Sequence, residues 1–67
     1  MNKLEISFNL GFKAFNEGKK CIPSFDSEFN QQILSNCKNF QGTIYCNKWE
    51  GGWLEAKYEK IDKYIID

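Results

Sequence analysis

The sequence predicts an all-α fold, in which two main helices cross at small residues and a third, short helix lies in the connector between them. Apolar residues recur at intervals of three and four near both ends of the chain, which is the spacing of one helix face. Glycines stand at matching places in these two segments. The chain has 67 residues, which predicts one small helical domain, residues 1–67, with a thin core.

The first predicted helix covers about residues 3–17. Its apolar stripe repeats every three or four positions, and the charged residues lie off it. The stripe consists of Leu4, Phe8, Gly11, Phe12 and Phe15. Gly18 is expected to end the helix, because glycine accepts the left-handed backbone conformation that closes many helices. Lys19 and Lys20 follow this stop.

A connector and a short second helix are expected next. Pro23 removes an amide donor and favours an extended conformation in the residue before it. Ser24, Asp26 or Ser27 can cap the helix that follows, which we place at about residues 26–37. Its weaker apolar stripe consists of Phe25, Phe29, Ile33 and Cys37. Several Gln and Asn residues make the segment polar, so it is expected to pack on one side only.

The third predicted helix runs from about residue 48 to residue 65, after a loop at residues 38–47. Its stripe is the clearest in the chain and consists of Trp49, Trp53, Ala56, Ile61, Tyr64 and Ile65. Gly51 and Gly52 interrupt this helix, and each costs about 0.5–1 kcal/mol relative to alanine. Close backbone approach explains both, so we expect the third helix to cross the first one there. The matching small residues of the first helix are Gly11, Ala14 and Gly18, and Trp49 and Trp53 are expected to cover the contact.

The charged residues balance, which argues against strong non-specific nucleic-acid binding. Nine Lys face nine Asp plus Glu, and binding of that kind depends on neutralising phosphates. The chain has no Arg and no His, so it lacks the side chain best suited to phosphate and the commonest acid–base group. A Cys nucleophile would have no His base. We therefore predict a binding protein that is not an enzyme, with no catalytic residue, no cofactor and no metal site.

Three cysteines, Cys21, Cys37 and Cys46, bear on location. Their number and spacing do not suit zinc, which usually takes four Cys or His ligands. They are expected to be reduced thiols that are buried or half-buried. Residues 1–20 lack the apolar run of a signal peptide, and no segment approaches the roughly 20 apolar residues of a membrane span. The sequence thus predicts a cytoplasmic location and no membrane contact.

Two short segments carry a resemblance to a known family. The matching residues are Gly11, Ala14 and Gly18, then Pro23, then Trp49, Gly51, Gly52, Trp53, Glu55 and Ala56. The second segment is the specific one, because two tryptophans that flank two glycines are rare by chance. In this order the pattern resembles ribosome modulation factor and its small bacterial and phage-encoded relatives.

The resemblance implies two helices joined by a connector and docking on the small ribosomal subunit. There the family factor contacts ribosomal RNA near the messenger-binding region and helps ribosomes to pair in an inactive state. This chain departs from the family in two ways. Its segment between Pro23 and Trp49 is longer and carries an extra helix, and its net charge is zero, whereas the family factor is strongly basic.

The first functional hypothesis is therefore a translation regulator that binds the ribosome or another RNA-containing complex. Lysine side chains are its candidate phosphate contacts. These candidates are Lys13, Lys19, Lys20, Lys48 and Lys57. The alternative interpretation of the same lysines is that they keep the surface soluble.

The second hypothesis is a phage- or mobile-element-encoded inhibitor that binds a host protein. The neutral surface and the many aromatic residues favour it, since Tyr and Trp dominate protein interfaces. The candidate contacts are Phe29, Phe40, Tyr45, Tyr58, Glu50, Glu55 and Glu59. A homodimer is compatible with either hypothesis, because a thin core gains from a second copy.

Overall fold

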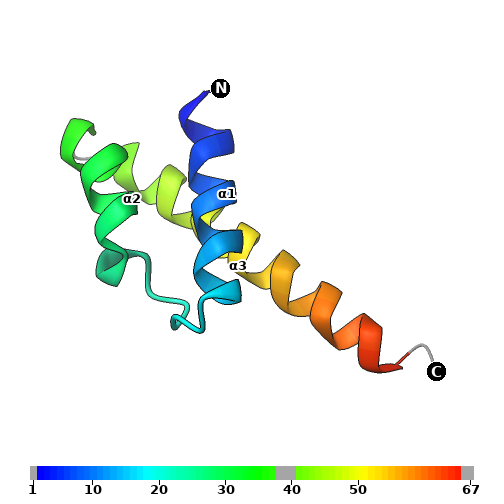
Figure 1. Ribbon diagram of the computed structural model, residues 1–67. Coiled ribbons are helices and arrows are strands. Elements are labelled where there is room, and N and C mark those ends of the chain that lie inside the picture. Colours follow the sequence, from blue (N-terminus) through cyan, green and yellow to red (C-terminus); the bar gives the residue numbers. More distant parts are fainter. Residues whose placement is uncertain (1, 38–40, 66–67) are drawn as a thin grey trace.

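The structure is a computed structural model that describes residues 2–37 and 41–65 (Figure 1). The described part contains three α-helices and two short 3₁₀ helices, η1 and η2, and no strand. In chain order they are α1 (Lys3–Asn16), η1 (Pro23–Phe25), α2 (Ser27–Gln32), η2 (Leu34–Asn36) and α3 (Gln41–Ile65). The predicted all-α fold class is confirmed, and α1 and α3 form the main helix pair.

The long helix α3 determines the shape of the molecule (Figure 1). Helix α1 crosses α3 near its middle, and α2 lies beside the N-terminal half of α3. The C-terminal half of α3 extends away from the other helices. The molecule is accordingly elongated, with extents of 46 × 19 × 18 Å.

Helix α1 has well-defined ends. The Asn2 side chain caps its start by accepting a hydrogen bond from the Glu5 amide at 2.8 Å. Gly18 ends the helix with a φ of 79°, as the sequence predicts. The amide of Lys19 donates to the carbonyl of Ala14 at 2.9 Å, and that of Gly18 donates to Phe15 at 2.9 Å. These two bonds are the pattern of a glycine-closed helix end.

The buried face of α1 differs from the predicted stripe. Ser7, Leu10, Gly11 and Ala14 are the buried residues of this helix, whereas Leu4 is exposed and the phenylalanines lie half-buried along the edge. Small side chains face α3 because the two backbones come too close for a ring to fit between them. The buried Ser7 hydroxyl is satisfied by donating to the Lys3 carbonyl at 2.7 Å.

Two glycines define the crossing of α1 and α3. A Cβ atom at Gly11 would lie within 3.0 Å of the backbone of Trp49, and one at Gly52 would lie equally close to the backbone of Phe8. Real Cβ atoms essentially never approach so closely, so each helix places a glycine against the main chain of the other. The predicted crossing at small residues is confirmed at these positions.

The other two glycines of the predicted contact do not take part in it. A Cβ atom at Gly51 would meet no heavy atom within 4 Å, and the same holds for Gly18. Gly51 lies one residue, about 100° around the helix, from Gly52 and so points away from α1. Gly18 serves the helix end instead. The expectation that Gly18 and Gly51 line the crossing is therefore wrong.

The second predicted helix, at residues 26–37, is broken in two by Ile33, where α2 stops and η2 begins. Of the three candidate caps, Asp26 is the one used. Its carboxylate accepts from the amides of Glu28 at 3.1 Å and Phe29 at 3.4 Å. The packing is one-sided as predicted, since Phe29 and Ile33 are buried and the Gln residues are exposed.

Helix α3 begins earlier than the sequence suggests. Residues 41–47 are helical, so this part of the loop predicted at residues 38–47 is wrong, and residues 38–40 lie outside the described part. Tyr45 and Cys46 pack against the core, and this packing outweighs the weak helix propensity of the β-branched residues before them. Gly42 is tolerated in the first turn, where a Cβ atom would lie 3.6 Å from the Leu34 side chain, an ordinary contact.

The core lies where α2 meets the α1–α3 pair. Its buried apolar members are Leu10, Ala14, Phe29, Ile33 and Trp49. The rings of Phe29 and Trp49 are 6.2 Å apart between centroids, and both side chains are fully buried. The N-terminal half of α3 is thus packed against both α1 and α2.

Candidate functional site

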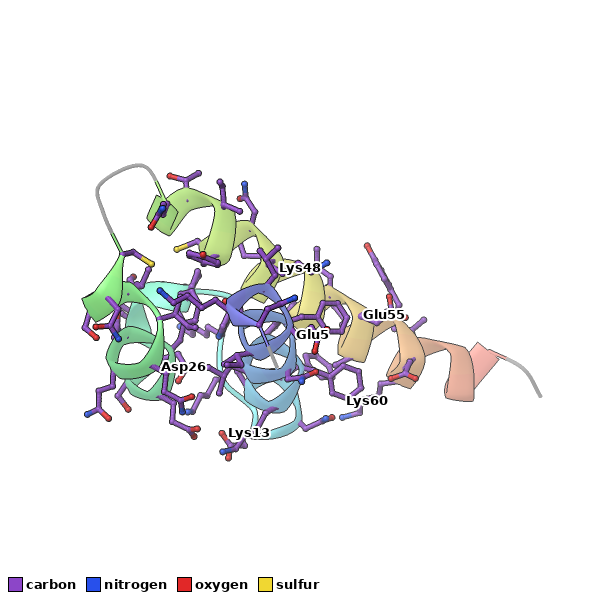
Figure 2. The ribbon with its side chains drawn as sticks, turned by 90° about the horizontal axis from the view of Figure 1, so that it is seen from above. Glu5, Lys13, Asp26, Lys48, Glu55 and Lys60 are labelled. Carbon is purple, nitrogen blue, oxygen red and sulfur yellow. The ribbon has the colours of Figure 1, made fainter. Side chains whose placement is uncertain are left out.

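The predicted RNA-binding lysines fall into separate groups on the surface, and Lys13 is already engaged in an ion pair. Its Nζ lies 2.7 Å from the Glu28 carboxylate, whose hydrogen bond and charge raise the pKa of Lys13 above its ordinary value. This ion pair links α1 to α2 on an exposed surface, where salt screens it. Figure 2 shows Lys13 on the same side of the molecule as Lys60, with Lys48 on the opposite side.

Three lysines of α3 lie over aromatic rings. The distances from Nζ to the ring centroid are 5.5 Å for Lys48 over Phe8, 5.7 Å for Lys57 over Trp53 and 5.9 Å for Lys60 over Phe15. Such contacts hold the ammonium groups near the surface while leaving them hydrated. Sequence reasoning missed Lys60, and its spacing of three from Lys57 was the available signal.

An aromatic pair fixes the end of α1 to α3. The rings of Phe15 and Trp53 meet edge to face, with centroids 5.0 Å apart and planes at 89°. The indole N–H of Trp53 donates to the carbonyl of Lys19 at 2.8 Å. The connector that begins at Lys19 is thereby anchored to the middle of α3, so Trp53 covers this part of the contact, as predicted.

Trp49 has a different role from the one predicted, since its ring turns towards α2. Its indole N–H donates to the Asp26 carboxylate at 2.9 Å. Asp26 is 3% exposed, and Lys19 Nζ lies 3.8 Å from its other oxygen. Asp26 therefore joins the connector, α2 and α3 through one buried carboxylate (Figure 2).

Phe25 is the most exposed large apolar residue of the described part, at 81%. It ends the short turn η1, which Pro23 starts. Beside it lies a small hollow of about 150 Å³. The hollow is lined by Lys19, Lys20, Ile22, Phe25, Asp26 and Trp49. We call Lys19, Lys20 and Phe25 the Phe25 face. It combines an exposed ring with two exposed lysines, and Lys19 also forms ion pairs with Glu17 at 3.3 Å and Asp26 at 3.8 Å.

Sequence reasoning placed Phe25 in the apolar stripe of the second helix and so missed this feature. The signal that could have revealed it is the proline two positions earlier. A Pro-started turn ends before α2 begins, and the register of the following helix then no longer applies to Phe25. Lys19 and Lys20, which were predicted as phosphate contacts, are exposed beside the hollow.

The predicted protein-binding residues differ in their exposure. The prediction that Phe29 contacts a partner is wrong, because this residue is fully buried in the core. Tyr45 is half-buried against that core. Phe40 lies outside the described residues. Tyr58, Glu55 and Glu59 are exposed, and Glu50 is half-buried. Among the described side chains of α3, Tyr58 is the exposed aromatic residue, and Tyr45 and Trp53 are half-buried.

A second depression lies on the opposite side of the crossing and is lined by Glu5, Phe8, Asn9 and Lys48. Opposite charges face each other across it (Figure 2). It therefore offers less to an anionic ligand than the Phe25 face does.

A comparison with known proteins finds no matching family model, no matching curated protein and no matching solved structure. The resemblance to ribosome modulation factor therefore stays a prediction. Within residues 2–37 and 41–65, no His, Cys, Asp and Glu side chains gather into a group able to hold a metal ion. In the same residues, no helix is both long enough and apolar enough to cross a membrane.

The cysteines are free, half-buried thiols, as predicted. Burial raises the pKa of Cys21 and of Cys46, and the nearby Glu50 carboxylate raises both further. Fewer thiolates are therefore present in the folded protein than in the unfolded chain at the same pH. The thiols of the unfolded chain therefore ionise at a lower pH than those of the folded protein. The stability that Cys21 and Cys46 contribute is complete below about pH 9 and is lost as the pH rises further.

At about pH 8, iodoacetamide is expected to modify Cys21 and Cys46 several-fold more slowly in the folded protein than in urea, because only the thiolate reacts. Quenched aliquots analysed by mass spectrometry of tryptic peptides give the rate for each site. Equal rates with and without urea would contradict the raised pKa values.

Proposed function

We propose that this chain is a non-catalytic binding protein that docks on an RNA-containing complex, the ribosome being the first candidate, through the Phe25 face. The motif shared with ribosome modulation factor supports the choice of the ribosome. The exposed Phe25 ring and the lysines beside it support RNA as the ligand. The rest of the molecule would hold this face in position.

The exposure of Phe25 is the observation that carries the proposal. Leaving a phenylalanine in water forgoes roughly 2 kcal/mol of burial, and a small protein with a thin core has little stability to spare. Single-stranded nucleic acids bind by stacking their bases on such rings, with each stack contributing roughly 1–3 kcal/mol. The ring also stands on a turn fixed by proline, so little order is lost on binding.

Lysines supply the second half of the interface. Lys19 and Lys20 flank the hollow beside Phe25. Lys57 lies over the ring of Trp53, whose indole N–H donates to the connector carbonyl of Lys19, and Lys60 lies over the Phe15 ring. An exposed ring next to two lysines matches the ring-plus-phosphate pattern of single-strand binding. The zero net charge of the chain confines this attraction to a local patch.

Co-sedimentation with purified bacterial ribosomes over a salt series tests the proposal. The wild type is expected to bind with an affinity that falls steeply as salt rises. Phe25→Ala is expected to weaken binding at least about tenfold through the lost stack. Lys19→Ala combined with Lys20→Ala is expected to reduce the slope of log affinity against log salt by about 1.4.

Two exposed residues away from the Phe25 face provide matched controls. Lys3→Ala removes one positive charge and Leu4→Ala removes one exposed apolar side chain, both from the first turn of α1. Each is expected to bind ribosomes about as well as the wild type. Binding that ignores salt, or an equal loss in the controls, would contradict the proposal. Recovery of a single host protein without RNA would instead favour the inhibitor hypothesis.

A further inference from the structure

The outer face of α3 carries a row of exposed apolar side chains. Its exposed large apolar members are Ile44 (57%), Leu54 (37%), Tyr58 (56%) and Ile61 (37%). They lie opposite the face that packs on α1 and α2, to which Trp49, Gly52 and Ala56 belong. Nothing in the described part of the chain covers this row.

The row follows a heptad pattern. The positions are Ile44, Asn47, Gly51, Leu54, Tyr58 and Ile61. The steps alternate between three and four residues, which is the spacing of a seam between paired helices. Ile65 continues the spacing in the sequence. A side of a helix that merely faced water would have no reason to keep this order.

Gly51 stands in the middle of this row and has no role within the protomer. Nothing lies within 4 Å of the position of its missing Cβ atom. A glycine inside a helix costs about 0.5–1 kcal/mol relative to alanine. The close crossing with α1 offsets that cost at Gly52, whereas nothing within the protomer offsets it at Gly51. A second helix that approaches the row closely would give Gly51 the same function that Gly52 has.

We propose that the row, Ile44 to Ile61 on α3, is the interface with a second copy of this chain, and that the two α3 helices pair antiparallel. A two-fold axis would lie beside the peptide between Gly52 and Trp53. Gly51 of one copy then faces Leu54 of the second copy, and Ile44 faces Ile61 of the second copy. Because the pairing is isologous, every contact occurs twice.

The charges beside the row select this arrangement. In a helix pair, the residues next to the seam face each other across it and set the orientation. In the antiparallel arrangement, Glu50 faces Lys57 of the second copy. Lys48 likewise faces Glu55 of the second copy, so both of these flanking pairs join opposite charges. A parallel, in-register pair would place Glu50 against Glu55 of the second copy, a contact between like charges that the antiparallel pair avoids.

The polar positions of the seam also match. Asn47 of one copy faces Tyr58 of the second copy, so an amide and a phenol meet in the same layer. Small Gly51 beside larger Leu54 gives the central layers alternating size, which allows side chains to interdigitate. By its helical register, the row lies on the side of α3 opposite to Trp49 and Gly52, which face α2 and α1.

Sedimentation equilibrium on five proteins tests the proposal, in reducing buffer and over a range from about 5 µM to about 500 µM. The wild type is expected to show a reversible monomer–dimer equilibrium within this range. Glu50→Lys and Lys57→Glu are each expected to raise the dimer dissociation constant roughly tenfold, since each variant turns two attractive pairs into repulsive ones. The double variant restores opposite charges and is expected to return to within about threefold of the wild type.

Several outcomes would overturn the proposal. They are a wild type that stays monomeric throughout the range, a Glu50→Lys variant that dimerises more tightly, and a double variant no better than the single ones. Far-ultraviolet circular dichroism confirms that each variant is folded. Phe25→Ala serves as the matched control and is expected to dimerise like the wild type. Failure of ribosome binding therefore leaves this test unaffected, and the two proposals can fail separately.

Discussion

Gly52→Ala is expected to lower the free energy of unfolding by more than about 3 kcal/mol, and only Gly11→Ala, at the same crossing, is expected to cost as much. The added Cβ atom would lie within 3.0 Å of the backbone of Phe8 and close to the adjoining turn of α1. A backbone cannot rotate aside as a side chain does, so α1 and α3 must separate. A chain of this size has on the order of 7 kcal/mol of stability in total, and thermal melting should show a drop of at least about 15 °C.

Gly51→Ala is the matched control, one residue away and chemically the same change. No atom obstructs its Cβ, and alanine is the better helix former, so the protein is expected to gain about 0.5–1 kcal/mol. Urea unfolding at low micromolar concentration measures the protomer without self-association. If the two variants shift the unfolding midpoint in the same direction, the crossing described above is wrong.

Asp26→Ala is expected to cost about 2–4 kcal/mol, the second large effect, as the sum of a lost cap and a lost side-chain hydrogen bond. The carboxylate caps α2 at Glu28 and Phe29 and accepts the indole N–H of Trp49. Losing a helix cap costs about 1 kcal/mol. A buried N–H without a partner costs roughly a further 1–3 kcal/mol. Urea unfolding followed by tryptophan fluorescence measures the loss.

Two further variants separate these contributions. Asp26→Asn keeps one acceptor oxygen, which can serve either the cap or the indole, so it is expected to fall between the wild type and Asp26→Ala. In a Trp49→Phe background no indole N–H remains, and Asp26→Ala should then cost only the cap. A double-mutant cycle is therefore expected to give a coupling energy above about 1 kcal/mol. Strict additivity would show that the hydrogen bond contributes nothing to stability.

The crossing could be predicted from the sequence because glycines in helices are costly and need a reason. Gly11 and Gly52 indicated the close approach, and the structure places both of them in it. The sequence could not show which glycine of the pair Gly51 and Gly52 faces inwards. A shift of one residue turns a helix position by about 100°, and the apolar stripe of α3 was too wide to settle the rotation.

Elements that depend on distant contacts were predicted less well. The start of α3 at Gln41 depends on Tyr45 and Cys46 packing against the core, which no local propensity records. Phe29 was expected both in the apolar stripe of the second helix and as a candidate protein contact, and the structure buries it. It is buried because a short capped helix turns one narrow face inwards, and that orientation follows from the hydrogen bond between Asp26 and Trp49.

The lysines of the candidate site could be predicted from the sequence, whereas the exposure of Phe25 could not. Lys19 and Lys20 follow a glycine that ends a helix, and residues at such places are usually exposed. The exposure of Phe25 follows from the turn η1, and a three-residue 3₁₀ turn leaves no periodic signal in a sequence.

The reciprocal glycines have a consequence for how this small frame can change. At two places the contact between α1 and α3 brings main chain against main chain, with Gly11 beside the Trp49 carbonyl and Gly52 beside that of Phe8. These main-chain contacts involve no outward-facing side chain, so the crossing angle between α1 and α3 does not depend on the residues at outward-facing positions. Those positions can be substituted to bind a new target while the two helices keep their geometry.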